Sequence, residues 1–339
     1  MKRILRVGAS IVLVVGIFFF ALPKIADFSE VWTEIGAMTL IELAFMLAAT
    51  FWNIFTYWLV MMSSLPGSNI WQTMKVNQAS TAVANTLPGG GAIGVGVTYG
   101  MYGSYGFTRS QISLAVLVSG IWNNFVKLGM PVVALIFVAL ESNVGGGFVI
   151  AAMLGLIVLL AAIGSFGAVL SSDRLAAAVG RRLEKIISSL RKPFREEPVT
   201  EVAAKTVAFR HDAISLVRER WFPLTSFTII SHVSLYFVLL IALRNVGVPG
   251  RAVSWPEVLA AFAFVRLISA LPITPGGLGV VELGLSAALV TAGGDRVPVV
   301  AAVLVYRALT YLLPIPIGLA LYLTYRKGSE ARRERQAVL

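Results

Sequence analysis

The chain has 339 residues, of which 57% are hydrophobic and 13% are charged, and its net charge is +11. Soluble domains carry about 25% charged residues, so a chain this apolar cannot cover itself with polar surface and is predicted to lie in a bilayer. Cysteine is absent and there are only two histidines, which excludes disulfides, thiolate nucleophiles and multi-histidine metal sites. We therefore expect no metal and no cofactor.

The basic excess is interpreted as a sign of membrane topology rather than of nucleic-acid binding, because no basic domain stands apart from the apolar stretches. Lys and Arg accumulate in cytoplasmic loops, next to anionic lipid headgroups. Here they are concentrated at the N-terminus, in residues 173–220 and in residues 326–335. All three regions are predicted to be cytoplasmic, which places both termini on the inner side of the cell membrane.

Six stretches are apolar and long enough to cross the bilayer, which takes about 20 residues as a helix. They are residues 7–23, 43–62, 110–140, 143–172, 221–243 and 297–325. Each is predicted to be helical because lipid offers free backbone groups no other partner. The first stretch follows basic residues like a signal peptide, but no small-residue cleavage site comes after it, so we interpret it as a retained helix.

Two further segments return to the face from which they start. With the basic regions inside, residues 66–108 begin and end on the cytoplasmic side, whereas residues 250–296 begin and end outside. The first segment holds Pro88-Gly89-Gly90 and the second holds Pro275-Gly276-Gly277. Pro and Gly at this density break a helix, and broken backbone at membrane depth is tolerated only inside protein or beside a wet cavity. Both segments are predicted to be re-entrant hairpins.

A shift of 187 residues superimposes the two Pro-Gly-Gly sequences and also places Gly106 on Gly293 and Arg109 on Arg296. Equivalent hairpins that enter from opposite faces form an inverted repeat, which is typical of transporters that bind substrate near the midplane. The predicted fold is an all-α polytopic membrane bundle of two inverted repeats. Its parts are a first repeat (1–172), a cytoplasmic linker (173–220), a second repeat (221–326) and a basic tail (327–339).

The linker is predicted to contain two helices. Apolar residues recur at helical spacing among basic ones, which indicates an amphipathic helix on the inner leaflet; they are Leu175, Val179, Leu183, Ile186 and Leu190. Pro193 and Pro198 end it. A second helical stretch is expected over about 199–217.

Four ionisable residues lie at membrane depth: Lys127, Arg266, Glu282 and Arg307. Each costs about 2.5–3.5 kcal/mol at the bilayer centre, so such residues face partners or a polar pathway. The simplest pairing is an Arg266–Glu282 ion pair across the second break. Three cations against one anion still leave a positive surplus, which a phosphate headgroup or water would compensate. The amides of the turns at Pro88, Gly89, Gly90, Pro275, Gly276 and Gly277 are candidates to join this headgroup site.

The second break lies in the sequence Leu271-Pro-Ile-Thr-Pro-Gly-Gly-Leu-Gly-Val-Val-Glu282. It resembles the signature of the flippase-like family named for the transmembrane region of lysylphosphatidylglycerol synthase, and Leu87-Pro-Gly-Gly-Gly91 resembles its weaker first-half counterpart. The resemblance implies an integral membrane protein that binds or translocates lipids. No aminoacyltransferase domain follows Arg335, so lysine transfer is not implied. Only the second motif carries an acidic residue, so an asymmetric site is expected.

The function expected from these features is non-enzymatic translocation of an anionic lipid between leaflets, the lipid being a phospholipid or a polyprenyl-phosphate-linked one. Membrane lipids are the expected partners, and a homo-oligomer is left open. One alternative is a transferase acting on polyprenyl-phosphate sugars, but Glu282 stands alone in the membrane and no Asp-x-Asp pattern occurs. The other alternative is an accessory subunit without transport of its own.

The topology can be tested directly because the chain has no native cysteine. A cysteine introduced at Ser110 should react with an impermeant thiol reagent only from the cytoplasmic side, and one at Val297 only from the outside. The measurement is labelling in intact cells compared with inverted vesicles. If both positions react from the same side, the inverted arrangement is wrong.

Overall fold

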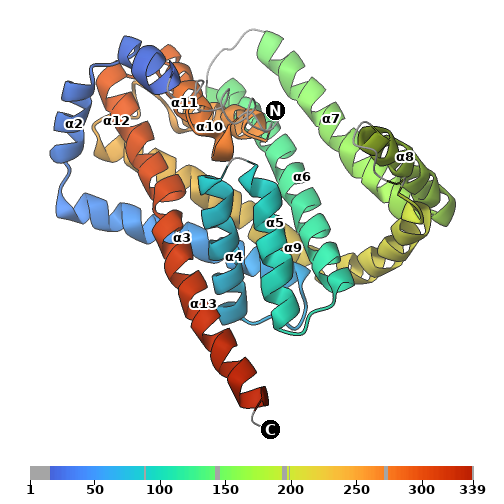
Figure 1. Ribbon diagram of the computed structural model, residues 1–339. Coiled ribbons are helices and arrows are strands. Elements are labelled where there is room, and N and C mark those ends of the chain that lie inside the picture. The colour runs from blue at the N-terminus through green and yellow to red at the C-terminus, as the bar shows by residue number, and fades with distance from the viewer. Residues whose placement is uncertain are drawn as a thin grey trace.

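The computed structural model describes residues 16–87, 89–141, 146–192, 197, 199–270 and 274–337, and within these residues it contains helices and turns but no strand (Figure 1). The predicted all-α class is confirmed. The α-helices are α2 (Phe28–Gly36), α3 (Leu40–Ser64), α4 (Ile70–Thr86), α5 (Gly90–Ser104), α6 (Arg109–Glu141), α7 (Gly146–Ser171), α8 (Asp173–Arg191), α9 (Val202–Asn245), α10 (Trp255–Ile268), α11 (Val280–Thr291), α12 (Arg296–Arg307) and α13 (Pro314–Ala337). Short turns are η1 (Ile17–Ala21), η2 (Leu22–Lys24), η4 (Pro275–Gly277) and η5 (Ala308–Leu312).

Five helical segments are long and apolar enough to cross a bilayer, and each corresponds to one of the predicted spans. They are Leu40–Ser64, Arg109–Glu141, Ile150–Ser171, Val202–Asn245 and Arg296–Lys327. The predicted first span, residues 7–23, lies largely outside the described residues. The protein is therefore a multi-pass helical membrane protein, as its composition predicts.

The linker differs from the prediction in one respect. Helix α8 ends at Arg191, before the two prolines, as expected. The second linker helix, however, continues into the following span as α9, a single helix of 44 residues with Pro223 inside it. Close packing against α8 supports this continuity, since a Cβ on Gly180 would lie 2.6 Å from the Ala203 Cα. A proline weakens a helix but does not end one that is packed along its length.

The two Pro-Gly-Gly segments each join a pair of short helices that double back on each other. Helices α4 and α5 form the first hairpin, and α10 and α11, with η4 between them, form the second. Gly89 adopts the left-handed conformation (φ 70°) at the first tip, where glycine is favoured. Gly90 lets α5 approach α4, because a Cβ there would lie 2.5 Å from the Val83 carbonyl oxygen.

The open ends of the hairpins lie at opposite ends of α6, and their tips meet between them. Near the start of α6, the Tyr99 hydroxyl of α5 lies 2.7 Å from the Ser113 hydroxyl. Near its end, the rings of Phe137 and Trp255, at the beginning of α10, are 4.9 Å apart. With 33 residues α6 is about 50 Å long, so these contacts are far apart. The tip turn η4 contacts both α4 and α5.

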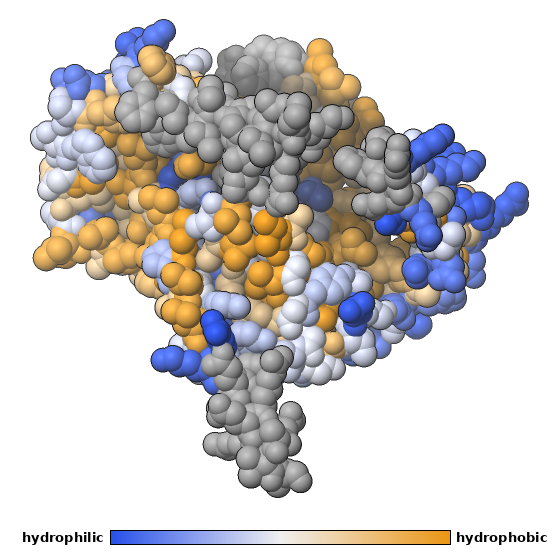
Figure 2. Space-filling view, viewed as in Figure 1, coloured by the Kyte–Doolittle hydropathy of each residue, from blue (hydrophilic) through white to orange (hydrophobic). Residues whose placement is uncertain are grey.

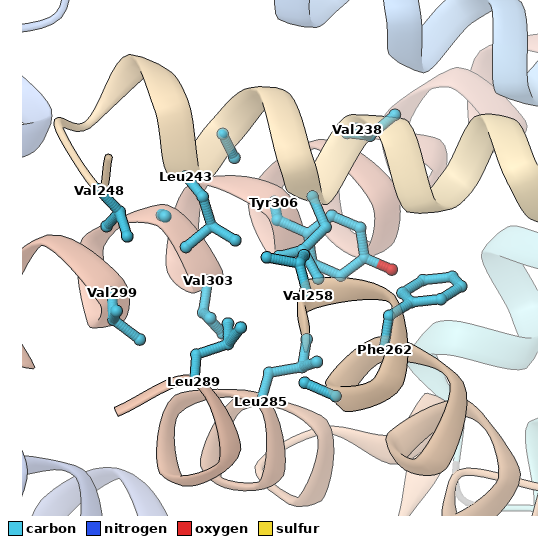
Figure 3. Close-up of a cluster of buried hydrophobic side chains, with 14 of the residues drawn as sticks. Val238, Leu243, Val248, Val258, Phe262, Leu285, Leu289, Val299, Val303 and Tyr306 are labelled. Carbon is cyan, nitrogen blue, oxygen red and sulfur yellow. The ribbon is translucent and has the colours of Figure 1, made fainter. Parts of the chain in front are cut away.

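The largest buried apolar core lies in the second half of the chain. Side chains of α9, α10, α11 and α12 interlock there, among them Leu243, Phe262, Leu289 and Val303 (Figure 3). Helix α7, in contrast, has no buried residue in its apolar window, although it packs against α6 through contacts such as that between Phe166 and Trp122. Hydrophobic side chains also cover much of the visible surface, whereas hydrophilic ones gather where α8 lies (Figure 2). This distribution suits a bundle solvated by lipid.

Gly318 provides a test of the packing between α13 and α4. A Cβ at Gly318 would overlap the backbone carbonyl of Gln78, whereas a Cβ at Gly167 of α7 would meet nothing within 4 Å. We expect Gly318→Leu to lower the free energy of unfolding in detergent by about 1–3 kcal/mol or more through overpacking, and Gly167→Leu to leave it nearly unchanged. Equal effects of the two substitutions on chemical denaturation would contradict this packing.

Candidate functional site

A polar cavity of about 430 Å³ lies where the tips of the two hairpins meet the long helices. Its walls come from α3, α4, α6, α9, α10 and α11, from the turn η4, and from the segment that runs from α12 through η5 into α13. Polar side chains dominate this lining: Asn53, Tyr57, Asn77, Gln78, Thr81, Asn85, Lys127, Arg266, Ser269, Tyr306, Arg307, Thr310 and Tyr311. A cavity with this lining at the junction of two broken hairpins is the candidate site.

All three membrane-embedded cations predicted from the sequence line this cavity. Lys127 comes from α6, Arg266 from the last turn of α10 and Arg307 from the end of α12. They are thus drawn together from positions up to 180 residues apart in the chain. A polar space accommodates the Lys127 charge without requiring its side chain to reach a membrane surface.

Glu282 forms its ion pair with Arg307. The Nε of Arg307 donates to Oε1 of Glu282 at 2.8 Å, and the other carboxylate oxygen accepts from the Gly279 amide at 2.7 Å. A second guanidinium nitrogen donates to the Gly276 carbonyl at 3.2 Å, and the guanidinium lies 4.4 Å above the Tyr311 ring. Glu282 is 1% exposed, so its charge depends on these partners. Arg307 thereby joins the second tip to η5.

The expected Arg266–Glu282 pair is wrong. Arg266 instead points into the cavity toward α3, where a guanidinium nitrogen lies 3.4 Å from the Tyr57 hydroxyl. Its buried Nε has no hydrogen-bond partner among the described residues, and no described carboxylate lies within ion-pair distance. The physical reason is that both oxygens of Glu282 are already engaged at the start of α11, on the side that faces α12.

The first tip is tied to the turn η5, which follows α12, by reciprocal hydrogen bonds between Asn85, at the end of α4, and Tyr311. The Asn85 side-chain amide donates to the Tyr311 carbonyl at 3.0 Å, and the Tyr311 hydroxyl donates to the Asn85 carbonyl at 2.6 Å. The π-helical turn η5 directly follows Arg307. Such turns inside α-helices occur frequently at functional sites.

The Pro-Gly-Gly residues contribute unequally to the site. Gly276 lines the cavity and is packed against Tyr311, whereas Gly277 is buried. Gly89 and Gly90 form the first turn and its contact with α4, but they do not line the cavity. Pro88 and the side chain of Pro275 lie outside the described residues. The two breaks therefore differ in what they contribute to the cavity wall: the second provides Gly276, whereas Gly89 and Gly90 of the first provide nothing.

Several cavity residues were missed at the sequence level. Asn53 and Tyr57 lie one helical turn apart in α3, and Asn53 also donates to the Ser231 carbonyl and the Ser234 hydroxyl of α9 at 2.8 Å. An Asn and a Tyr four residues apart in an uncharged span are a usable signal. Tyr306 and Tyr311 carried none, because tyrosine is common in apolar helices. His232 of α9 does not line the cavity; it is buried with its Nδ1 3.0 Å from the Thr228 carbonyl oxygen.

A family model described as "Lysylphosphatidylglycerol synthase TM region" matches residues 7–318. The chain belongs to this family. No curated protein matches the chain. Membership in the lysylphosphatidylglycerol synthase transmembrane family identifies an integral membrane protein with a lipid-related function. The matched range includes every cavity residue named above.

The importance of the Glu282–Arg307 pair in this family member can be measured by a double-mutant cycle. Glu282→Gln and Arg307→Gln should each destabilise the protein, and the double substitution should cost less than their sum by about 0.5–3 kcal/mol. The measurement is the free energy of unfolding in mixed micelles. The Glu201–Lys205 pair, with both side chains 73% exposed, is the control and should show almost no coupling. Additive effects at Glu282 and Arg307 would contradict the pairing.

Proposed function

We propose that this protein moves an anionic lipid between the two leaflets of the cell membrane, with the lipid phosphate bound in the polar cavity. The lipid is a phospholipid or a polyprenyl-phosphate-linked lipid, and the step is non-covalent, so no catalytic residue is invoked. The observation that supports this proposal best is the charge of the cavity. Three cations line it, and only one of them is neutralised by a described carboxylate.

The two cations without a described carboxylate partner are Lys127 and Arg266. Cations at membrane depth are stabilised only by a counter-charge or by water. A phosphate diester entering the cavity supplies the counter-charge, and the guanidinium of Arg266 is suited to bind two of its oxygens at once. The buried Nε of Arg266, unpartnered among the described residues, is available for such a contact. Neutral lining groups such as Asn77 and Thr310 would complete the headgroup shell.

The hairpins supply a plausible route for movement between the leaflets. Their open ends lie at opposite ends of α6 and their tips meet at the cavity. This arrangement supports the proposal that both hairpins are re-entrant and belong to inverted repeats. In that case each hairpin separates the cavity from one face of the membrane, and rocking of one repeat against the other exposes the cavity alternately. The contact of η4 with α4 and α5 is where the two tips would separate, and the Asn85–Tyr311 hydrogen bonds between α4 and η5 would break with it.

We propose that the side of the molecule that carries the basic linker faces the cytoplasm, and the bias of Lys and Arg toward cytoplasmic loops supports this orientation. The hydroxyl of Ser110, at the start of α6, donates to Asp212 of the linker half of α9 at 3.3 Å. The first hairpin therefore opens on the same side as the linker. Under this proposal the C-terminal helix also ends inside the cell.

The transport proposal predicts a headgroup-selective exchange between leaflets. In phosphatidylcholine vesicles containing the purified protein, chain-labelled fluorescent phosphatidylglycerol should become accessible to external dithionite much faster than in protein-free vesicles. Arg266→Gln should slow this exchange about tenfold or more, because a charge-assisted hydrogen bond contributes about 1.5–3 kcal/mol. Lys127→Gln should act in the same direction.

Two controls make the result specific. Arg251→Gln changes the same residue type at an exposed position outside the cavity and should leave the rate unchanged. Chain-labelled phosphatidylcholine, which has no net negative charge, should exchange more slowly than phosphatidylglycerol. The proposal fails if the protein does not accelerate exchange of phosphatidylglycerol, or if Arg266→Gln exchanges it as fast as the original protein.

A further inference from the structure

A second pocket, of about 180 Å³, lies beside the polar cavity on the far side of the contact between α6 and α10. Its lining has no polar side chain, and it is formed by α6, α7 and α10. We call it the apolar groove; its walls include Leu128, Val132 and Leu135 of α6, Val158 of α7, and Phe264 and Leu267 of α10. Val158 and Phe264 are 53% and 42% exposed, so the groove is accessible from the surface that faces the bilayer core.

The groove and the polar cavity are neighbours at two points. Lys127 lines the cavity and the next residue, Leu128, lines the groove. In the same way Arg266 lines the cavity and Leu267 lines the groove. Consecutive Cα atoms are about 3.8 Å apart, so each of the two cations without a described carboxylate partner stands directly beside a wall of the groove.

The groove and the polar cavity approach each other at the C-terminal end of α10. Helix α10 ends at Ile268, one residue after Leu267, and Ser269 already lines the polar cavity. Neighbouring residues at the end of α10 therefore line the groove and the cavity. A molecule with a charged end and an apolar end has a group that suits each space.

We infer that the groove binds a hydrocarbon chain of the same lipid whose phosphate occupies the cavity. The inference rests on the proposed function and narrows its substrate to a lipid-linked phosphate that enters sideways from the bilayer. An apolar recess without filling atoms loses dispersion contacts, and a lipid chain restores them. A free phosphate has no group for this recess. The two cations, in turn, discriminate a chain linked to an anionic headgroup from any other chain.

The test is cross-linking of the purified protein, in phosphatidylcholine vesicles, with phosphatidylglycerol that carries a photoactivatable diazirine in the middle of one chain. Peptides of α6, α7 and α10 around the groove should be labelled at least fivefold more strongly than by the same probe with a choline headgroup. Arg266→Gln should reduce the phosphatidylglycerol labelling at the groove by a similar factor. Added soluble glycerol phosphate should not compete, because it lacks the chain.

A matched pair of substitutions in α7 tests the groove itself. Val158→Trp places a large ring in the groove, whereas Ile157→Trp changes the neighbouring residue, which is 62% exposed and does not line it. Labelling of α6 and α10 should fall several-fold in Val158→Trp only. Equal labelling by the two headgroups, insensitivity to Arg266→Gln, or equal effects of the two tryptophans would each overturn the inference and make the groove a site for surrounding lipid.

These outcomes are separable from those of the transport assay. Headgroup-dependent labelling without faster leaflet exchange would mean that the chain is bound as inferred but the lipid is not moved, so the proposed function alone would fail. Faster exchange with labelling that ignores the headgroup would leave the transport proposal standing and remove the groove from it.

Discussion

The ion pair between Glu282 and Arg307 holds the broken backbone of the second hairpin in place. Its carboxylate accepts from the Gly279 amide at the start of α11, and its guanidinium reaches the Gly276 carbonyl of the tip. Unpaired amides and carbonyls at membrane depth cost several kcal/mol each, so a Gly-rich turn persists there only with such partners. Because Arg307 also adjoins η5, which bonds Asn85, the position of the first tip depends on this pair through Tyr311.

This arrangement leaves the cavity with an excess of positive charge. Glu282 is directed away from Lys127 and Arg266 by its own hydrogen bonds, so neither cation has an ion-pair partner in the described part of the chain. Charges of one sign in a confined space repel each other, and the energy needed to hold them is recovered when an anion binds. The Glu282–Arg307 ion pair and the surplus of positive charge in the cavity are therefore consequences of the same geometry.

The first hairpin plays a different role from the second, although both contain Pro-Gly-Gly. Its glycines serve helix–helix contact: Gly90 brings α5 against the end of α4, and Gly94 brings it against Ser80. It contributes polar side chains from α4, such as Asn77 and Gln78, but no charge to the cavity. The second hairpin contributes Arg266 and, through Glu282, the orientation of Arg307. The two hairpins therefore share a Pro-Gly-Gly break but differ in the side chains that they bring to the cavity.

The sequence by itself determined that this protein lies in lipid, and it determined five membrane-length helices, the positions of both Pro-Gly-Gly breaks and the set of cations in the cavity. These features depend on local composition, because lipid forces apolar stretches into helices and leaves buried charges few and conspicuous. It did not determine which cation pairs with Glu282, the union of the linker helix with α9, or the presence of Asn53 and Tyr57 in the wall. Those features depend on which helix faces come into contact. Arg266 and Arg307 are both arginines in apolar segments, so the sequence does not distinguish them, and only the packing of α10, α11 and α12 places Arg307 beside the carboxylate of Glu282.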